Sequence, residues 1–316
     1  MGLDTASVKF VCAAKSFGVD FTDTLMIGRQ NLLTTAPSLQ RVFSVLGINM
    51  NADEFLRDNE YGDAFFCLMG AKKVSSLDYS SYEDATIIHD MNSPIPDDLR
   101  GRYSVVYDGG TLEHVFNIPQ ALKNCMEMVR VGGHFMQVHA ANNFMGHGFW
   151  QFSPELIFRA FSATNGYQVE AVLLHEVLPT AGWVCRSDAW YAVTDPDEIK
   201  QRVEFCNSFS TYILTIARKL ADVEIFAQSP QQSDYVAAWG RHIRAKTESA
   251  SATDSRDLDS HIGRQRSWRS YVPKRIKRVL RSLHRMLQPV PPVPGPFDRP
   301  YFKRICEDDL LRGRLK

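Results

Sequence analysis

Short apolar runs alternate with segments of helical periodicity over most of the chain. Five runs rich in β-branched and aromatic residues have the length of buried strands, and they cover residues 24–27, 73–79, 86–90, 104–107 and 134–138. Helical periodicity is clear between the last two runs, where Leu122, Cys125 and Val129 fall on one helix face. Strands that alternate with helices predict an α/β fold built on a doubly wound, mostly parallel sheet.

Further elements are expected on both sides of this region. Helical patterns cover residues 5–17, 37–47 and 52–71, and another helix opens at Ser153. Later strand-like runs cover residues 167–174, 190–193 and 211–219. A chain of 316 residues, 44% of them hydrophobic, can bury one substantial core with appendages. Residues 1–228 are assigned to that core domain.

The strand at 104–107 ends at Asp108-Gly109-Gly110, which interrupts the apolar run. Asn117 can cap the following helix, and Gly132-Gly133 is expected to end it. In open α/β sheets, ligands bind beyond the carboxyl ends of the strands. Residues 108–114 are therefore expected at the edge of the sheet where the chemistry takes place.

Three of the predicted strands end in an acid: Asp78, Asp90 and Asp108. The carboxylate of Asp78 can accept hydrogen bonds from both hydroxyls of a ribose, and Tyr79 beside it is placed to stack on an adenine. Each acid alone could equally be a solvated loop residue. Three acids in register favour a ligand site.

The stretch from residue 103 to residue 138 resembles a known enzyme family. Asp108, the step Leu112-Glu113-His114 and the turn Val131-Gly132-Gly133 match, in order and spacing, the class I S-adenosylmethionine-dependent methyltransferases, in particular the small-molecule group often called type 11. The resemblance extends more weakly over residues 20–220. It implies a Rossmann-like methyltransferase fold with S-adenosylmethionine as the cofactor. It also implies a late strand, assigned to 211–219, that inserts antiparallel between earlier ones.

The resemblance further implies which residues contact the cofactor. Asp78 and Tyr79 would hold the adenosine, and Asp90 with Met91 would lie near the adenine amino group. The turn that begins with Asp108 and Gly109 completes this cofactor site, together with the turn after the first strand.

That first turn departs from the family pattern. The family has several glycines here, whereas this chain has only Gly28, followed by Arg29 and Gln30. Two interpretations follow: the side chains of Arg29 and Gln30 contact the cofactor carboxylate in place of backbone groups, or the site has lost tight cofactor binding. An ordinary strand-to-loop turn is a third alternative.

Methyl transfer from a sulfonium is an in-line displacement, and a hydroxyl acceptor benefits from a general base. His147 is the better candidate base, because His114 belongs to the family step and is read first as architectural or cofactor-proximal. His89 and His139 lie inside strands and are expected to be satisfied core histidines. No metal site is expected, because histidines and acids lack ligand spacing on any one element.

The loop at 141–152 combines aromatic, amide and glycine residues around His147. Such a loop at the carboxyl edge of the sheet suits a lid or a substrate wall. The alternative is that its aromatic side chains only pack against the helix that follows.

Charge divides the chain unevenly. The net charge is zero, but residues 261–316 carry 15 Lys and Arg against 4 Asp and Glu, which leaves an acidic body. Residues 229–263 are rich in Ser, Thr, Asp and Gln and are expected to form a disordered linker. Residues 264–316 are expected to form a tail that contains a basic amphipathic helix over 271–287 and a Pro-rich stop.

Three partners remain open for the basic helix: an anionic membrane surface, a protein or nucleic acid, or the acidic body itself. Nucleic acid is disfavoured, because the tail shows no aromatic interleaving and no recognised nucleic-acid fold. No apolar stretch approaches the roughly 18 residues that span a bilayer. A cytoplasmic protein is expected, with at most peripheral contact at the inner membrane surface.

The predicted function is methyl transfer from S-adenosylmethionine to a small molecule, with a sugar or a glycan intermediate among the compatible acceptors. The alternative is a non-catalytic methyltransferase-like scaffold that is recruited through its basic helix. A nicotinamide-dependent oxidoreductase is disfavoured, because no G-x-G-x-x-G turn follows the first strand.

Overall fold

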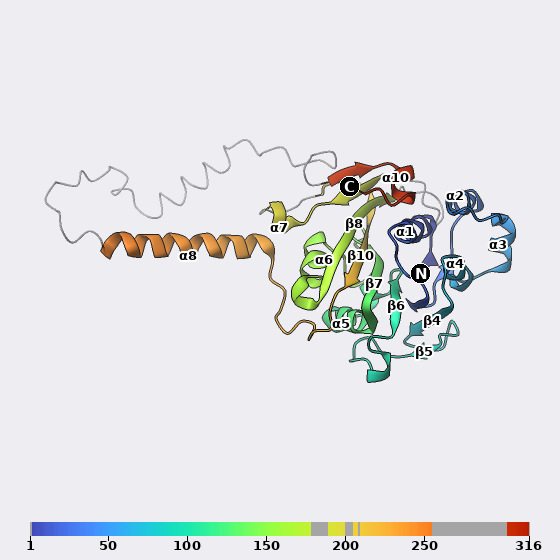
Figure 1. Cartoon of the computed structure of the whole chain (residues 1–316), viewed down its shortest axis with the longest axis horizontal. Coiled ribbons are helices and arrows are strands. Elements are labelled where there is room, and N and C mark those ends of the chain that lie inside the picture. The colour runs from blue at the N-terminus through green and yellow to red at the C-terminus, as the bar shows by residue number, and fades with distance from the viewer. Residues whose placement is uncertain (1, 178–188, 200–204, 208, 255–301, 316) are drawn as a thin grey trace.

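The computed structural model describes residues 2–177, 189–199, 205–207, 209–254 and 302–315. Its centre is a nine-stranded sheet in the order β11-β9-β8-β10-β7-β6-β2-β4-β5 (Figure 1). The strands are β2 (Asp23–Ile27), β4 (Lys73–Asp78), β5 (Ile87–Ile88), β6 (Tyr103–Asp108), β7 (Val129–Ala140), β8 (Tyr167–Val177), β9 (Trp190–Val193), β10 (Ser210–Lys219) and β11 (Phe302–Ile305). A separate parallel pair joins β1 (Gly2–Leu3) to β3 (Asn31–Leu32).

The pairing of the strands confirms the predicted fold class. Strands β5, β4, β2, β6 and β7 pair in parallel with one another. Strand β10 lies antiparallel between β7 and β8, which is the placement expected for the run at 211–219. The protein therefore has a doubly wound, mostly parallel sheet with a late antiparallel strand.

Helices cover both faces of the sheet. The described helices are α1 (Thr5–Ser16), α2 (Ala36–Leu46), α3 (Ala52–Asp58), α4 (Asp63–Leu68), α5 (Ile118–Met128), α6 (Pro154–Ala160), α7 (Pro196–Ile199), α8 (Ser233–Asp254) and α10 (Glu307–Leu311), with 3-10 turns η1 (Asp97–Leu99), η2 (Leu112–His114) and η3 (Ala163–Asn165). Alternate residues of one strand point to opposite faces. Val105 accordingly joins the core beneath α1, α2 and α4, whereas Val106 joins the core beneath α5 and α6.

Two predicted boundaries differ from the structure. The helix expected over 52–71 is interrupted and forms α3 and α4. Helix α5 ends at Met128, and β7 runs through Gly132-Gly133 instead of starting after it. Gly132 has φ +83°, and a Cβ on Gly133 would lie 2.7 Å from the carbonyl oxygen of Ser104. The glycine pair therefore allows an irregularity at which the register between β6 and β7 shifts.

The expected division of the chain at residue 228 also needs correction. Helix α8 occupies most of the expected linker over 229–263, and Figure 1 shows it extending away from the sheet. Its sequence contains five Ala and two Arg residues with one Lys and one Glu, which favour a helix over the disorder suggested by its Ser and Thr content. The basic helix expected over 271–287 lies outside the described residues.

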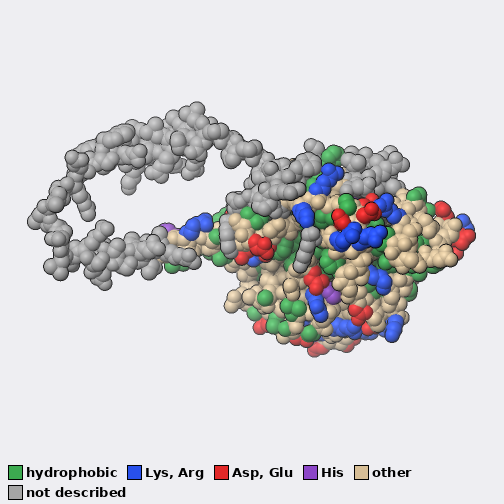
Figure 2. Space-filling view, turned by 45° about the horizontal axis from the view of Figure 1, so that its top comes forward, with side chains coloured by type: hydrophobic (Ala, Val, Ile, Leu, Met, Phe, Trp, Pro, Cys, Tyr) green, Lys and Arg blue, Asp and Glu red, His purple; other side chains and the backbone are tan. Residues whose placement is uncertain are grey.

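The end of the chain returns to the core domain. Strand β11 pairs antiparallel with β9, and α10 packs on α1 with Leu310 and Leu311 fully buried. Lys9 of α1 forms an ion pair with Glu307 at 3.1 Å, and Arg41 of α2 forms ion pairs with Glu307 at 3.3 Å and with Asp308 at 2.8 Å. Figure 2 shows acidic and basic side chains interspersed over the face that it displays. The core domain therefore includes residues far beyond 228.

None of the helices that the structure describes is both long enough and apolar enough to cross a membrane.

Candidate active site

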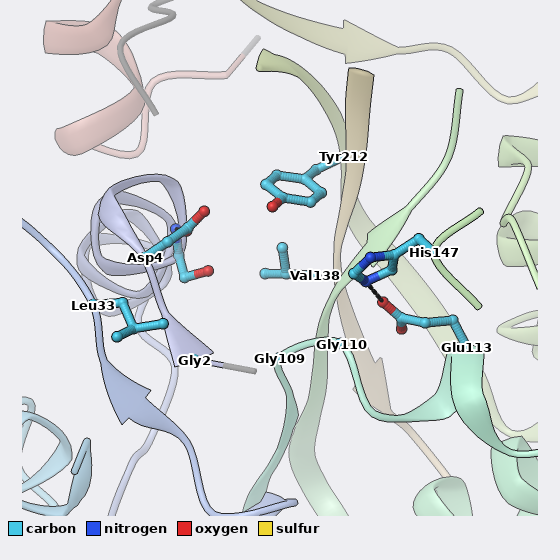
Figure 3. A pocket seen from close by; sticks show the side chains of 10 residues that line it. Gly2, Asp4, Leu33, Gly109, Gly110, Glu113, Val138, His147 and Tyr212 are labelled. Atoms are coloured by element: carbon cyan, nitrogen blue, oxygen red, sulfur yellow. Dashed lines mark hydrogen bonds and ion pairs between the residues drawn. The ribbon is translucent and has the colours of Figure 1, made fainter. Parts of the chain in front are cut away.

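A cavity of about 290 Å³ opens at the carboxyl ends of β6 and β7 (Figure 3). Its walls come from β1 and the start of α1, the loop after β3, the turn after β6, η2, the loop at 141–152, and strands β7 and β10. The lining residues are Gly2, Asp4, Ser7, Leu33, Gly109, Gly110, Glu113, Val138, His147 and Tyr212. The edge of the sheet at which a ligand was expected therefore holds a cavity, and two predicted site residues, Gly109 and His147, line it.

The turn after β6 packs tightly against the turn after β2. Gln30 is fully buried, and its Nε2 donates hydrogen bonds to the carbonyls of Ile27 at 2.9 Å and Gly28 at 3.1 Å. Its Oε1 is buried and has no hydrogen-bond partner among the described residues. A Cβ on Gly109 would lie 2.4 Å from that oxygen, so only glycine fits there without displacing Gln30.

Gly28 is required by the same packing. Its φ is +70°, and a Cβ there would lie 2.6 Å from Oγ1 of Thr111. The Thr111 hydroxyl donates to the carbonyl of Ile27 at 2.6 Å. Side chains of Gln30 and Thr111 thus occupy the turn in which the family has further glycines.

Arg29 faces a different part of the molecule. Its Nε lies 3.4 Å from Oδ2 of Asp63, and its Nη1 donates to the carbonyl of Glu83 at 3.1 Å. The guanidinium carbon lies 4.1 Å from the centre of the Tyr61 ring. Arg29 therefore ties the turn after β2 to α4 and to the loop after β4.

Four predicted cofactor residues lie along the neighbouring ends of β4 and β5, outside the cavity lining. Asp78 is half-buried and accepts a hydrogen bond on Oδ1 from the backbone N–H of Tyr79, whose own side chain is 74% exposed. Asp90 accepts hydrogen bonds from the backbone and side chain of Asn92, and these bonds lower the pKa of its carboxyl. Met91 is buried.

Asp108 belongs to a buried charge cluster instead of facing the cavity. Its oxygens accept hydrogen bonds from the backbone N–H groups of Thr111 at 2.8 Å and Leu112 at 3.3 Å. Nε2 of His139 lies 3.0 Å from Oδ2 of Asp108, and Nδ1 of His139 lies 2.5 Å from Oε2 of Glu113. All three side chains are almost completely buried.

The charges of this cluster compensate one another. Burial alone would lower the pKa of His139, but the carboxylates of Asp108 and Glu113 outweigh it and raise the pKa to about 10. Burial alone would likewise raise the pKa of Glu113, but the charged His139 lowers it. An imidazolium therefore lies between two carboxylates, which agrees with the expectation that His139 is a satisfied core histidine.

Glu113 lines the cavity, although the sequence did not single it out as a site residue. Its Oε2 contacts His139, whereas its Oε1 lies 3.5 Å from Nε2 of His147 (Figure 3). The hydrogen bond that the His147 ring donates to the Glu113 carboxylate raises the pKa of His147. The leucine-glutamate-histidine step placed Glu113 at the edge of the sheet. The direction of its side chain, toward His139 and His147, depends on tertiary packing that the sequence pattern does not encode.

His114 lies beside this pair. Its ring centre is 5.2 Å from that of His147, and burial lowers its pKa. The structure thus brings together both predicted catalytic histidines, although only His147 lines the cavity.

Comparison with known proteins gives structural similarity only. No family model matches the chain, and no curated protein matches it. One similar solved structure is a putative methyltransferase from Bacillus halodurans C-125, with 15% identity and a TM-score of 0.37 over 66% of this chain and 99% of that chain. TehB from Haemophilus influenzae has 14% identity and a TM-score of 0.35 over 66% and 61% of the two chains.

A third similar structure is the methyltransferase CalH in complex with SAH, with 13% identity and a TM-score of 0.35 over 66% of this chain and 54% of that chain. At this level of similarity, the assignment of the fold rests on the order and direction of the strands. The strand directions observed here, with β10 antiparallel between β7 and β8, are those that the sequence resemblance to class I methyltransferases implies.

Proposed function

We propose that this protein transfers a methyl group from S-adenosylmethionine to a small molecule, such as a sugar or a glycan intermediate. The observation that carries the proposal is the cavity beside Gly109-Gly110, at the carboxyl ends of β6 and β7, with His147 and Glu113 in its wall. Ligands of doubly wound folds bind at this edge. A volume of about 290 Å³ suits a small acceptor.

The residues at the neighbouring strand ends fit the proposed cofactor. S-adenosylmethionine carries an ammonium group, and the buried Oε1 of Gln30 is an acceptor without a partner among the described residues. Gln30 therefore suits the ammonium of the cofactor better than its carboxylate. Asp78 has a second oxygen for the ribose, and the exposed ring of Tyr79 can stack on the adenine.

When bound, the cofactor supplies the methyl group on a sulfonium. The residues of this chain would orient the acceptor and move its proton. His147 would take the proton of an acceptor hydroxyl at Nδ1, and Glu113, which lies 3.5 Å from the opposite nitrogen Nε2, would stabilise the imidazolium that forms. His139 holds Glu113 in place from the opposite side. Asp108 acts as a positioning residue, since both of its oxygens contact groups inside the core.

A scaffold without catalytic activity is the second candidate, and one observation favours it. Gln30 and Thr111 fill the turn after β2 with side chains, where the family has a glycine-rich loop that approaches the cofactor. Recruitment of such a scaffold through the basic segment 271–287 remains a proposal.

A transfer assay separates the two candidates. The full chain is incubated with methyl-labelled S-adenosylmethionine and a panel of sugars and glycan intermediates. An enzyme transfers label to a member of the panel, and His147→Ala lowers the rate at least tenfold while cofactor binding is kept. His242→Ala, on the exposed part of α8, is the matched control. If no member of the panel receives the label and the chain also fails to bind the cofactor, the result favours the scaffold.

A further inference from the structure

Three potential metal ligands meet beside the cavity. One carboxylate oxygen of Glu113 and one ring nitrogen each of His114 and His147 all lie within 4.8 Å of one another. Glu113 and His114 are consecutive residues of η2, whereas His147 comes from the loop at 141–152. Sequence spacing predicted no metal site, because the third ligand lies on a separate element that only the fold brings near.

Backbone contacts fix the loop of His147 against η2. The N–H groups of Phe149 and Trp150 both donate to the carbonyl of Glu113, at 2.9 and 3.2 Å. The indole Nε1 of Trp150 donates to the carbonyl of Val115 at 3.0 Å. A Cβ on Gly148 would lie 2.8 Å from the Glu113 carbonyl oxygen, so glycine is needed for this approach. The three candidate ligands are thus held together by the main chain.

The core also orients the carboxylate. Nδ1 of His139 contacts Oε2 of Glu113 at 2.5 Å, and this leaves Oε1 on the side of His147. Asp108 in turn contacts His139 at 3.0 Å. Residues that hydrogen-bond to a metal ligand fix its direction and strengthen its binding. A buried Asp108–His139–Glu113 chain of this kind supports the ligand set from behind.

We propose that Glu113, His114 and His147 bind a divalent first-row transition-metal ion, such as Zn²⁺ or Mn²⁺. Two imidazoles and one carboxylate suit such ions, and three protein ligands leave coordination positions open. The site is accessible, because His114 is exposed and both Glu113 and His147 line the cavity. The ion would bind at the cavity wall, where it can hold an oxygen of the acceptor and lower its pKa.

Metal binding does not depend on the proposed methyl transfer, but the suggested contact with the acceptor does. With an ion bound, Nε2 or Nδ1 of His147 serves as a ligand, and His147 acts as a general base only in the metal-free protein. Metal titration in the absence of the methyl donor therefore tests the site independently of the enzyme activity.

The test uses the full chain after removal of metals with a chelator. Zn²⁺ is titrated by calorimetry, and Co²⁺ by its visible absorption. One equivalent is expected to bind. His114→Ala and His147→Ala should each weaken binding by roughly 10–100-fold. His139→Gln leaves the three ligands in place but removes the partner that orients Glu113, and it should weaken binding by a similar factor. His242→Ala is the matched control and should bind like the wild type.

Circular dichroism checks that each variant is folded. His114 and His147 are at least partly exposed, so replacing either one leaves the core intact, whereas His139 is buried and its variant needs this check most. Failure to bind a stoichiometric ion would overturn the proposal, as would binding that both histidine variants retain. An intense near-ultraviolet thiolate band in the Co²⁺ spectrum would also overturn it, because cysteines would then be the ligands.

Discussion

Nδ1 of His139 lies 2.5 Å from Oε2 of Glu113, inside the core of the domain. The opposite nitrogen contacts Asp108 at 3.0 Å, so one buried cation connects the end of β6 with η2 through β7. Neither acid can remain charged in the core without this partner. The geometry of the cavity wall therefore depends on a histidine that does not line the cavity.

Replacing His139 should destabilise the protein strongly. His139→Gln leaves two buried carboxylates without their cation, and we expect a loss of about 3–5 kcal/mol in the free energy of unfolding. Urea denaturation followed by circular dichroism measures it. His134→Gln is the matched control on the same strand, because among the described residues His134 forms an ion pair with one acid, the partly exposed Glu170, at 3.3 Å. Equal losses in the two variants would contradict the assigned role.

The same cluster predicts how stability depends on pH. The carboxylates raise the pKa of His139 from 6.5 to about 10 in the folded state, although burial acts in the opposite direction. A raised histidine pKa gives stability that is fully present below pH 6.5 and is lost as the pH rises through 10. The wild type should therefore lose stability over this range more steeply than His139→Gln. Denaturation at several pH values in the presence of a chelator measures the difference, and parallel curves would contradict the prediction.

The contact between Gln30 and Gly109 makes a separate prediction. Gly109→Ala places a methyl group 2.4 Å from Oε1 of Gln30. The Gln30 side chain cannot move away easily, because its Nε2 donates two hydrogen bonds to backbone carbonyls. We expect a loss of about 1–3 kcal/mol from this overpacking. Gln30→Ala removes the clash, so the double variant should be more stable than the sum of the single effects predicts. Simple additivity in thermal denaturation would argue against the packing described.

The C-terminal segment should stabilise the domain. Leu310 is fully buried where α10 packs on α1, so Leu310→Ala should cost about 2–5 kcal/mol. Leu220→Ala is a matched control, because Leu220 is 48% exposed, and it should change stability by about 0.5 kcal/mol or less. A chain that ends at residue 228 should also be less stable than the full chain. Unchanged stability in Leu310→Ala would show that the end of the chain is not part of the core.

Local patterns in the sequence were sufficient for eight of the nine strands of the large sheet. Runs of β-branched and aromatic residues identified β2, β4, β6, β8 and β10, and the family resemblance placed β10 antiparallel. The short run Phe302–Ile305 was missed, because four residues carry little periodicity and its partner β9 is distant in the sequence. Helix α8 was missed because its polar composition was taken as a sign of disorder.

The candidate site was less predictable, because tertiary packing decides where polar side chains point. The sequence placed His147 at the cavity and His139 in the core, and the structure agrees. Asp108 was expected to face the cofactor, yet its oxygens contact His139 and backbone N–H groups. The approach of His147 to Glu113 depends on the fold of the loop at 141–152, which no local spacing encodes.

Binding of the cofactor tests the central claim most directly. The full chain is titrated by calorimetry with S-adenosylmethionine and with S-adenosylhomocysteine, in parallel with Asp78→Ala and with the exposed control Asp98→Ala. We predict micromolar binding of both ligands, retained by the control and substantially weakened by Asp78→Ala. Absence of binding to a folded chain would contradict the proposed methyltransferase activity.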